Sequence, residues 1–356
     1  MLKQNTVLVL GAGASVDAEM PIGSNLANII ASNFYFEFNY GLTKGDHRIF
    51  SILKRKFPEN EVLNTYLNAC RRIHDGVVAW RSIDNYIDAH KSDVECNFLA
   101  KLGITEAILR AERKSNLFTD RSVGKKSNFS GLVNSWYDEF ASVVFQNVVK
   151  ADLNEAIQRV KIVSFNYDRC FQQAMALWIE RAYHVSFSQA CEYISSIEIV
   201  HPYGSVGKFC NSNVVDGVSY GAAPSENEIP TLAENIRTYS EQIVDVNFLQ
   251  QIKNIYSFAD SVFYLGCAYH PQNLELLKAP QNNYEKFIAG TAMGISEDAL
   301  EFIGEQLVAG MFTIPNGFSN AKAFFPSVNG NQIRLHFDKN CLSMIKYYRQ
   351  RITAYS

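Results

Sequence analysis

The stretch Val7–Ser15 constrains the fold of this chain more than any other segment. It begins with four consecutive aliphatic residues, a run typical of a parallel strand that is buried on both faces. Gly11 and Gly13 follow, and two glycines at this spacing let the backbone turn tightly and approach a ligand with no Cβ in the way. A helix that begins here points free N–H groups at an anion such as a phosphate. The stretch therefore predicts a nucleotide-binding strand–turn–helix unit.

Five further strands are expected, and helical patterns separate them. They lie near residues 161–165, 197–201, 261–265, 286–289 and 333–337. Strands that alternate with helices indicate right-handed crossovers and a parallel sheet. The sequence thus predicts an α/β fold, with a Rossmann-like parallel sheet that carries helices on both faces.

Residues 34–154 interrupt this alternation, because their apolar residues recur at three- and four-residue spacing. We expect an all-helical insertion there, after the first strand unit. Residues 1–33 and 155–356 would then form one discontinuous sheet domain. Within the second part, residues 231–258 are expected to form a single helix.

Composition narrows the class of protein. The chain has 356 residues, of which 47% are hydrophobic, so it can bury a sizeable core. Its net charge of −3 gives no broad electrostatic reason to expect direct nucleic-acid binding. No run approaches the roughly 18 apolar residues of a membrane span. The seven cysteines are scattered without a CxxC pair, which argues against a zinc ribbon and favours reduced thiols in a cytoplasmic protein.

Polar and glycine-containing segments follow four of the expected strands. They are Gly11–Ser15, Asn166–Asp168, His201–Ser205 and Gly266–His270. Because ligands of parallel α/β sheets bind at the carboxyl ends of the strands, we expect these segments to share one edge. The fingerprint of dinucleotide-binding dehydrogenases requires a third glycine where this chain has Val16. A hydride-transfer enzyme is therefore disfavoured.

The same segments resemble the pattern of sirtuins. The matching motifs are Gly11-Ala12-Gly13-Ala14-Ser15, Asn166-Tyr167-Asp168, His201-Pro202-Tyr203-Gly204 and Leu265-Gly266-Cys267-Ala268. Together with Ser82-Ile83-Asp84 and His270-Pro271-Gln272-Asn273, these motifs are similar to those of the sirtuin-like NAD-hydrolase family of bacterial antiphage defence systems. The chain lacks the four-cysteine zinc module of deacylating sirtuins, and Pro21-Ile22-Gly23-Ser24-Asn25 replaces their arginine-containing segment.

The resemblance implies an NAD+ glycohydrolase that cleaves NAD+ to nicotinamide and ADP-ribose. It implies an NAD-depleting effector in antiphage defence (abortive infection), with NAD as substrate and no metal. The sheet domain would bind NAD. The implied partners are further copies of the chain, a HerA-like ATPase or an Argonaute. Two alternatives stay open: a non-catalytic subunit that senses NAD or ADP-ribose, and a protein deacylase or ADP-ribosyltransferase.

The resemblance and the strand-end rule assign roles to individual residues. Asn166 would bind a ribose hydroxyl or orient water, and Asp168 would bind the nicotinamide carboxamide or brace Asn166. His201 would accept a proton. The residues expected to bind the dinucleotide are Gly11, Ala12, Gly13, Ser15, Asn166, Asp168, Gly266, Cys267 and His270. Structural alternatives are a plain tight turn at Gly11–Ser15, an Asx turn at Asn166–Asp168, and a helix N-cap at Asp84.

Overall fold

A computed structural model describes residues 2, 4–80, 82–121, 129–209, 217–281, 286–314 and 333–353. Its centre is a six-stranded parallel sheet with the order β10-β9-β8-β1-β4-β5. The strands are β1 (Thr6–Leu10), β4 (Val160–Ser164), β5 (Glu198–Val200), β8 (Ser261–Leu265), β9 (Phe287–Thr291) and β10 (Ile333–His336). In chain order this is the 3-2-1-4-5-6 arrangement of doubly wound folds. The predicted fold class is confirmed.

β1 lies inside the sheet because all five of its residues are apolar or small enough to be buried. Leu8 pairs with Ile162 of β4 on one side and with Phe263 of β8 on the other, and all three side chains are completely buried. The strand order reverses between β1 and β8. A crevice forms at such a reversal in open α/β sheets, and their ligands bind there.

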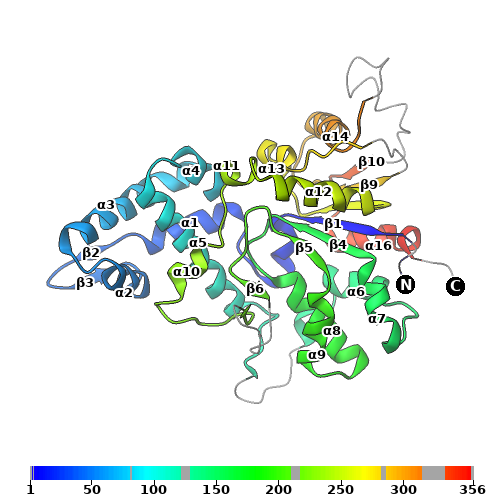
Figure 1. Cartoon of the computed structure of the whole chain (residues 1–356), viewed down its shortest axis with the longest axis horizontal. Helices are drawn as coiled ribbons and strands as arrows, with labels where there is room; N and C mark the ends of the chain where they lie inside the picture. Colours follow the sequence, from blue (N-terminus) through cyan, green and yellow to red (C-terminus); the bar gives the residue numbers. More distant parts are fainter. Residues whose placement is uncertain are drawn as a thin grey trace.

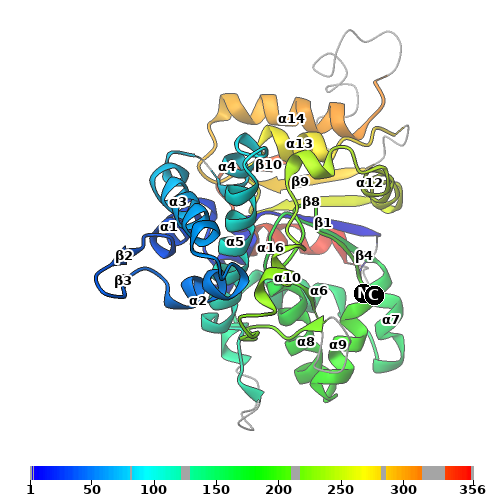
Figure 2. The same cartoon turned by 60° about the vertical axis from the view of Figure 1, so that its left-hand side comes forward.

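Helices cover both faces of the sheet (Figures 1 and 2). One face carries α6 (Trp136–Val144), α7 (Leu153–Gln158), α8 (Cys170–Tyr183), α9 (Phe187–Ser195) and α16 (Cys341–Ile352). The other carries α12 (Val246–Phe258), α13 (Pro271–Leu276) and α14 (Glu297–Met311). Side-chain caps fix several of their first turns, for example Ser135 at α6 and Asn340 at α16.

A helical unit extends from one end of the sheet (Figure 1). It consists of α1 (Gly23–Asn33), α2 (His47–Lys56), α3 (Asn60–Gly76), α4 (Ile83–Ala89) and α5 (Val94–Lys114), with the short 3-10 helix η2 (Val77–Ala79). α5 is at its centre and contacts α1, α3 and α4. The predicted boundaries at 33/34 and 154/155 stay a prediction, although α1 packs with this unit and α6 packs with α8 and α16.

The expectation of an all-helical insertion misses a hairpin, formed by β2 (Glu37–Phe38) and β3 (Leu42–Lys44). Strands of two and three residues are too short to show an alternating pattern in sequence. The hairpin protrudes at the far end of the helical unit (Figure 1), where Tyr40 is fully exposed.

The single helix expected over residues 231–258 is wrong. The chain forms α10 (Ile229–Ala233), α11 (Tyr239–Gln242) and α12 instead. The cause is local, since Thr238 and Asp245 turn their side chains onto the N–H groups of the residues that follow and begin new helices. The remaining short elements are η4 (Phe129–Gly131), η5 (Lys150–Asp152), β6 (Lys208–Phe209) and β7 (Gly217–Val218).

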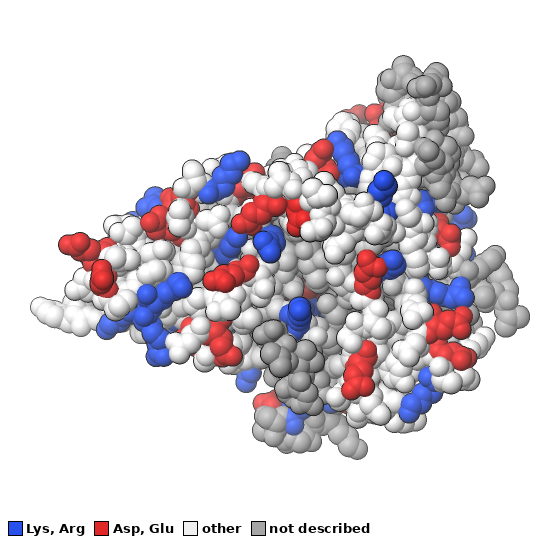
Figure 3. All heavy atoms as spheres, in the orientation of Figure 1, with Lys and Arg blue, Asp and Glu red and all other residues white. Residues whose placement is uncertain are grey.

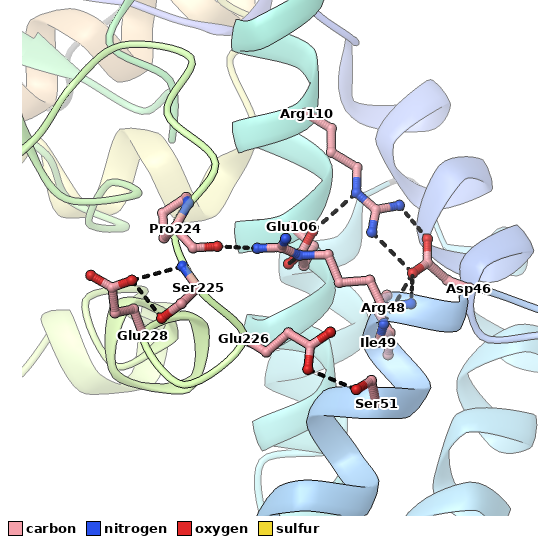
Figure 4. A network of polar contacts seen from close by, with 10 residues as sticks. All are labelled: Asp46, Arg48, Ile49, Ser51, Glu106, Arg110, Pro224, Ser225, Glu226 and Glu228. Carbon is pink, nitrogen blue, oxygen red and sulfur yellow. Dashed lines mark hydrogen bonds and ion pairs between the residues drawn. The ribbon is translucent and has the colours of Figure 1, made fainter.

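Arg48 joins α2 to α5 and to the segment before α10. Glu106 on α5 is almost fully buried and accepts hydrogen bonds from Arg48 at 2.7 Å and Arg110 at 3.0 Å (Figure 4). Arg48 also donates to the carbonyl oxygen of Pro224. Elsewhere charge is dispersed, and the face in Figure 3 shows acidic and basic side chains interspersed.

The described part of the chain contains no helix that is long and apolar enough to cross a bilayer. Six cysteines in that part are free thiols, and Cys210 lies outside the described residues.

Candidate active site at the carboxyl edge of the sheet

The glycine turn after β1 leads into a 3-10 helix, η1 (Ala12–Ala18), where the sequence predicted a helix start. The N–H of Gly11 donates to the carbonyl oxygen of Leu265 at 2.9 Å. The N–H of Gly13 donates to the carbonyl oxygen of Gly266 at 3.0 Å. A Cβ on Gly11 would lie 2.5 Å from the Gly266 oxygen, which no real Cβ tolerates. Both glycines are therefore required by the approach of one loop backbone to another.

Ser15 connects the glycine turn to the loop after β4. Its hydroxyl donates to Oδ1 of Asp168 at 3.0 Å and accepts a hydrogen bond from Nδ2 of Asn166 at 3.0 Å. All three side chains are buried. Segments more than 150 residues apart thus meet in one hydrogen-bonded cluster, as the strand-end rule predicts.

Asp168 also has a local structural role. Its Oδ1 accepts the N–H of Cys170 at 3.0 Å, which is an Asx turn at the start of α8. Burial raises the pKa of Asp168 above its usual value. The Asx-turn alternative for this residue is therefore present in the structure, together with the bond to Ser15.

His201 follows β5 and lies against the same loop. Its Nδ1 is 3.0 Å from the carbonyl oxygen of Asn166. A carbonyl oxygen only accepts, so a neutral imidazole held here carries its proton on Nδ1 and leaves a lone pair on Nε2. Burial lowers the pKa of His201 to about 4, with a smaller contribution from the charge of Arg169. The ring is thus neutral at pH 7.

A small cavity lies beside the Ser15 cluster. Its lining includes Ser15, Asn166, Asp168, Tyr137 and Phe171, and it has room for about one water molecule. Pockets for drug-sized ligands are much larger, about 300–1,000 Å³. A larger ligand that reaches this cavity must therefore displace the surrounding loops.

The residues of the loop after β8 lie in two places, some against the glycine turn and one beside Asp84. Gly266, with φ of +63°, packs on the glycine turn and donates to Oγ1 of Thr291 at 2.8 Å. The Cys267 thiol is directed at the Val9 carbonyl oxygen at 3.4 Å, and burial raises its pKa. His270 lies further along, beside Asp84. The N-cap alternative for Asp84 is wrong, because Ser82 caps α4 and Asp84 lies in its first turn. Burial raises the pKa of Asp84, whereas His270 lowers it.

The structure therefore brings the predicted residues together in two groups. Ser15, Asn166, Asp168 and His201 are connected by hydrogen bonds. Gly11, Gly13, Gly266 and Cys267 form a backbone contact beside them, while Ala12 is exposed and His270 lies with Asp84. Their roles toward a dinucleotide stay predictions.

Two residues of α6 that hold the glycine turn were not predicted from the sequence. Trp136 Nε1 and the Tyr137 hydroxyl both donate to the Ala14 carbonyl oxygen, at 2.6 and 3.0 Å. Asp17 in turn accepts the backbone N–H of Trp136 at 3.0 Å. The adjacent aromatic residues at 136 and 137 are a signal for burial, but no local pattern indicates this partner.

A buried ion pair next to the cluster was also missed. Glu112 of α5 accepts hydrogen bonds from the backbone N–H and the guanidinium of Arg169, and both side chains are completely buried. Arg169 also donates to the carbonyl oxygens of Val218 and Ser219. The pair joins the helical unit, the loop after β4 and the segment that begins at β7.

The described ranges hold no group of three or more His, Cys, Asp or Glu residues that could bind a metal ion. No family model and no curated protein matches the chain. A similar solved structure is a mutant of a Sir2 homologue in complex with 2'-O-acetyl ADP ribose. That likeness has a TM-score of 0.36 and 10% sequence identity, and it covers 99% of this chain and 95% of the other.

Proposed function

We propose that this chain binds NAD+ at the carboxyl edge of its sheet and hydrolyses the nicotinamide–ribose bond, giving nicotinamide and ADP-ribose. One observation carries the proposal: Ser15, Asn166 and Asp168 form a buried hydrogen-bonded cluster, and His201 is held on the backbone of Asn166. The resemblance of these motifs to those of sirtuin-like NAD-hydrolases supports NAD+ as the substrate.

The chemistry requires little beyond such a cluster. Cleavage of the glycosidic bond passes through an oxocarbenium-like transition state, so the site has to orient the ribose and direct a water molecule at it. His201 stays neutral, and its Nε2 lone pair accepts a proton from the attacking water or from a ribose hydroxyl. Its low pKa makes it a modest base that works over a wide pH range.

Asn166 supplies the orienting group. Its Nδ2 is engaged by Ser15, whereas no described residue donates a hydrogen bond to its Oδ1. Asn166 lines the small cavity, and a ribose hydroxyl or a water molecule there would donate to its Oδ1. Ser15 thereby fixes which way the amide points.

The finer biological role follows from the resemblance. NAD+ depletion would arrest a phage-infected cell, and the activity would be released by self-assembly or by a separately encoded partner such as a HerA-like ATPase or an Argonaute. Non-catalytic sensing of NAD+ or ADP-ribose is the alternative function, and it needs the same binding without turnover.

The test uses the purified full chain with NAD+ and chromatographic measurement of nicotinamide and ADP-ribose. Equimolar release of both without a peptide supports hydrolysis. Calorimetric binding of NAD+ or ADP-ribose without turnover supports the sensing subunit instead. Turnover that depends on an acetylated peptide supports a deacylase. The absence of both binding and turnover contradicts all three functions.

A further inference from the structure

The loop after β4 is divided between two parts of the molecule. In Asn166-Tyr167-Asp168-Arg169, the first and third side chains hydrogen-bond to Ser15 of the glycine turn. The side chain of Tyr167 bonds to Asp84 of the helical unit. That of Arg169 pairs with Glu112 of the same unit. Alternate residues of one short loop are thus held from opposite sides.

Tyr167 makes the contact nearest to the cluster. Its hydroxyl donates to Oδ1 of Asp84 in the first turn of α4. Its carbonyl oxygen accepts the N–H of Val206 at 3.1 Å, just after the His201–Ser205 loop. The side chain is 6% exposed. Tyr167 therefore joins α4 to the loops that carry Asn166 and His201.

α4 has a second hydrogen bond to this edge. Nδ2 of Asn85 donates to Oε1 of Gln272 at 2.7 Å, in the first turn of α13. The neighbouring Asn273 accepts the hydroxyl of Tyr203 at 2.7 Å. The first turn of α4 is thereby fixed to the loop after β4 and to α13, and α13 is bonded in turn to the loop after β5.

We propose that Asp84 is a positioning residue of the candidate site, which holds Tyr167 and through it sets the orientation of Asn166 and Asp168. The inference rests on the proposed function for what the site does. Movement of α4 then changes the geometry of the loop.

The bond needs an acceptor at position 84 and does not need a charge. Burial keeps the pKa of Tyr167 well above its usual value, so its hydroxyl stays protonated and donates. An asparagine at 84 offers an amide oxygen in place of the carboxyl oxygen as acceptor, whereas an alanine offers none. Positioning and direct charge stabilisation therefore make different predictions for Asp84→Asn.

The experiment compares Tyr167→Phe, Asp84→Ala and Asp84→Asn in the full chain. Tyr183→Phe is the matched control, because it removes a tyrosine hydroxyl bond to Val148 away from the sheet edge. One readout is kcat and KM for nicotinamide release. The other is hydrogen exchange of the Cys170 N–H, which reports Asp168 directly through its bond to Oδ1.

We expect Tyr167→Phe and Asp84→Ala to lower kcat at least about 10-fold, with KM changed less than about threefold. Exchange at Cys170 should accelerate about 10-fold in both. Asp84→Asn should recover kcat to within about threefold of wild type, and Tyr183→Phe should change neither readout by more than about twofold.

Equal behaviour of Tyr167→Phe and Tyr183→Phe in both readouts overturns the proposal. A loss in Asp84→Asn as large as in Asp84→Ala also overturns it, since the charge would then matter. If the wild-type chain releases no nicotinamide, the proposed function fails. Exchange at Cys170 then decides the positioning role alone: faster exchange in Tyr167→Phe supports it, and unchanged exchange overturns it.

Discussion

Nδ1 of His201 lies 3.0 Å from the carbonyl oxygen of Asn166, so the loop after β5 is fixed to the loop after β4. The contact sets the tautomer of the imidazole, because the carbonyl oxygen can only accept. Burial keeps the ring neutral, whereas the hydrogen bond to Asn166 by itself raises the pKa of His201.

The lowered pKa of His201, about 4, predicts an unusual pH profile. A base is active when unprotonated, so activity is present above pH 4 and is lost as the pH falls through 4. We expect kcat for nicotinamide release to change less than about 1.5-fold between pH 7.5 and 5.5. A histidine at its ordinary pKa of about 6.5 would lose activity about tenfold over this range. Circular dichroism at each pH controls for unfolding.

The contact between Gly11 and Gly266 predicts a cost for any side chain at position 11. The Cβ of Gly11→Ala would meet backbone atoms of Gly266 and Cys267 at 2.5 and 2.7 Å, and these cannot move without displacing β8. We expect the free energy of unfolding in urea to fall by about 2–3 kcal/mol. Gly41→Ala is the control, since nothing lies within 4 Å of its Cβ, and it should be neutral or slightly stabilising. Equal stability of the two variants would contradict the close approach.

The buried pair of Glu112 and Arg169 predicts a large loss of stability when its carboxylate is replaced by an amide. Glu112→Gln leaves the guanidinium of Arg169 buried without a carboxylate, which costs about 3–5 kcal/mol in the free energy of unfolding. Glu155→Gln removes a more exposed pair with Arg159 and should cost no more than about 0.5 kcal/mol. Urea denaturation measures both, and similar small losses would show that the Arg169 charge is satisfied by other groups.

The sheet could be predicted from the sequence because its strands are dense in buried aliphatic or aromatic residues and end at polar residues or glycine. Ser261–Leu265 was placed to the residue, and the other strands lie within two residues of their expected bounds. Single side chains that begin helices were missed. Thr238 and Asp245 divide the expected helix over 231–258, and the hairpin around Tyr40 is too short to show a period.

The convergence at the sheet edge could be predicted because parallel strands place their carboxyl ends together. That rule predicts that Ser15 lies near Asn166 and Asp168, although no local sequence pattern indicates the contact. The contacts of Glu112 with Arg169 and of Trp136 with Ala14 could not be predicted, because they join the helical unit and α6 to the edge across 57 and 122 residues. No periodicity specifies which loop a given helix will meet.

The rate of nicotinamide release in His201→Ala relative to wild type decides whether His201 is the base in NAD+ hydrolysis. We expect the wild-type chain to hydrolyse NAD+ and kcat to fall at least about 100-fold in the variant, since a positioned proton acceptor contributes about 10²–10⁴-fold. His47→Ala, an exposed histidine on α2, should match wild type. Wild-type turnover in a folded His201→Ala variant would contradict the account.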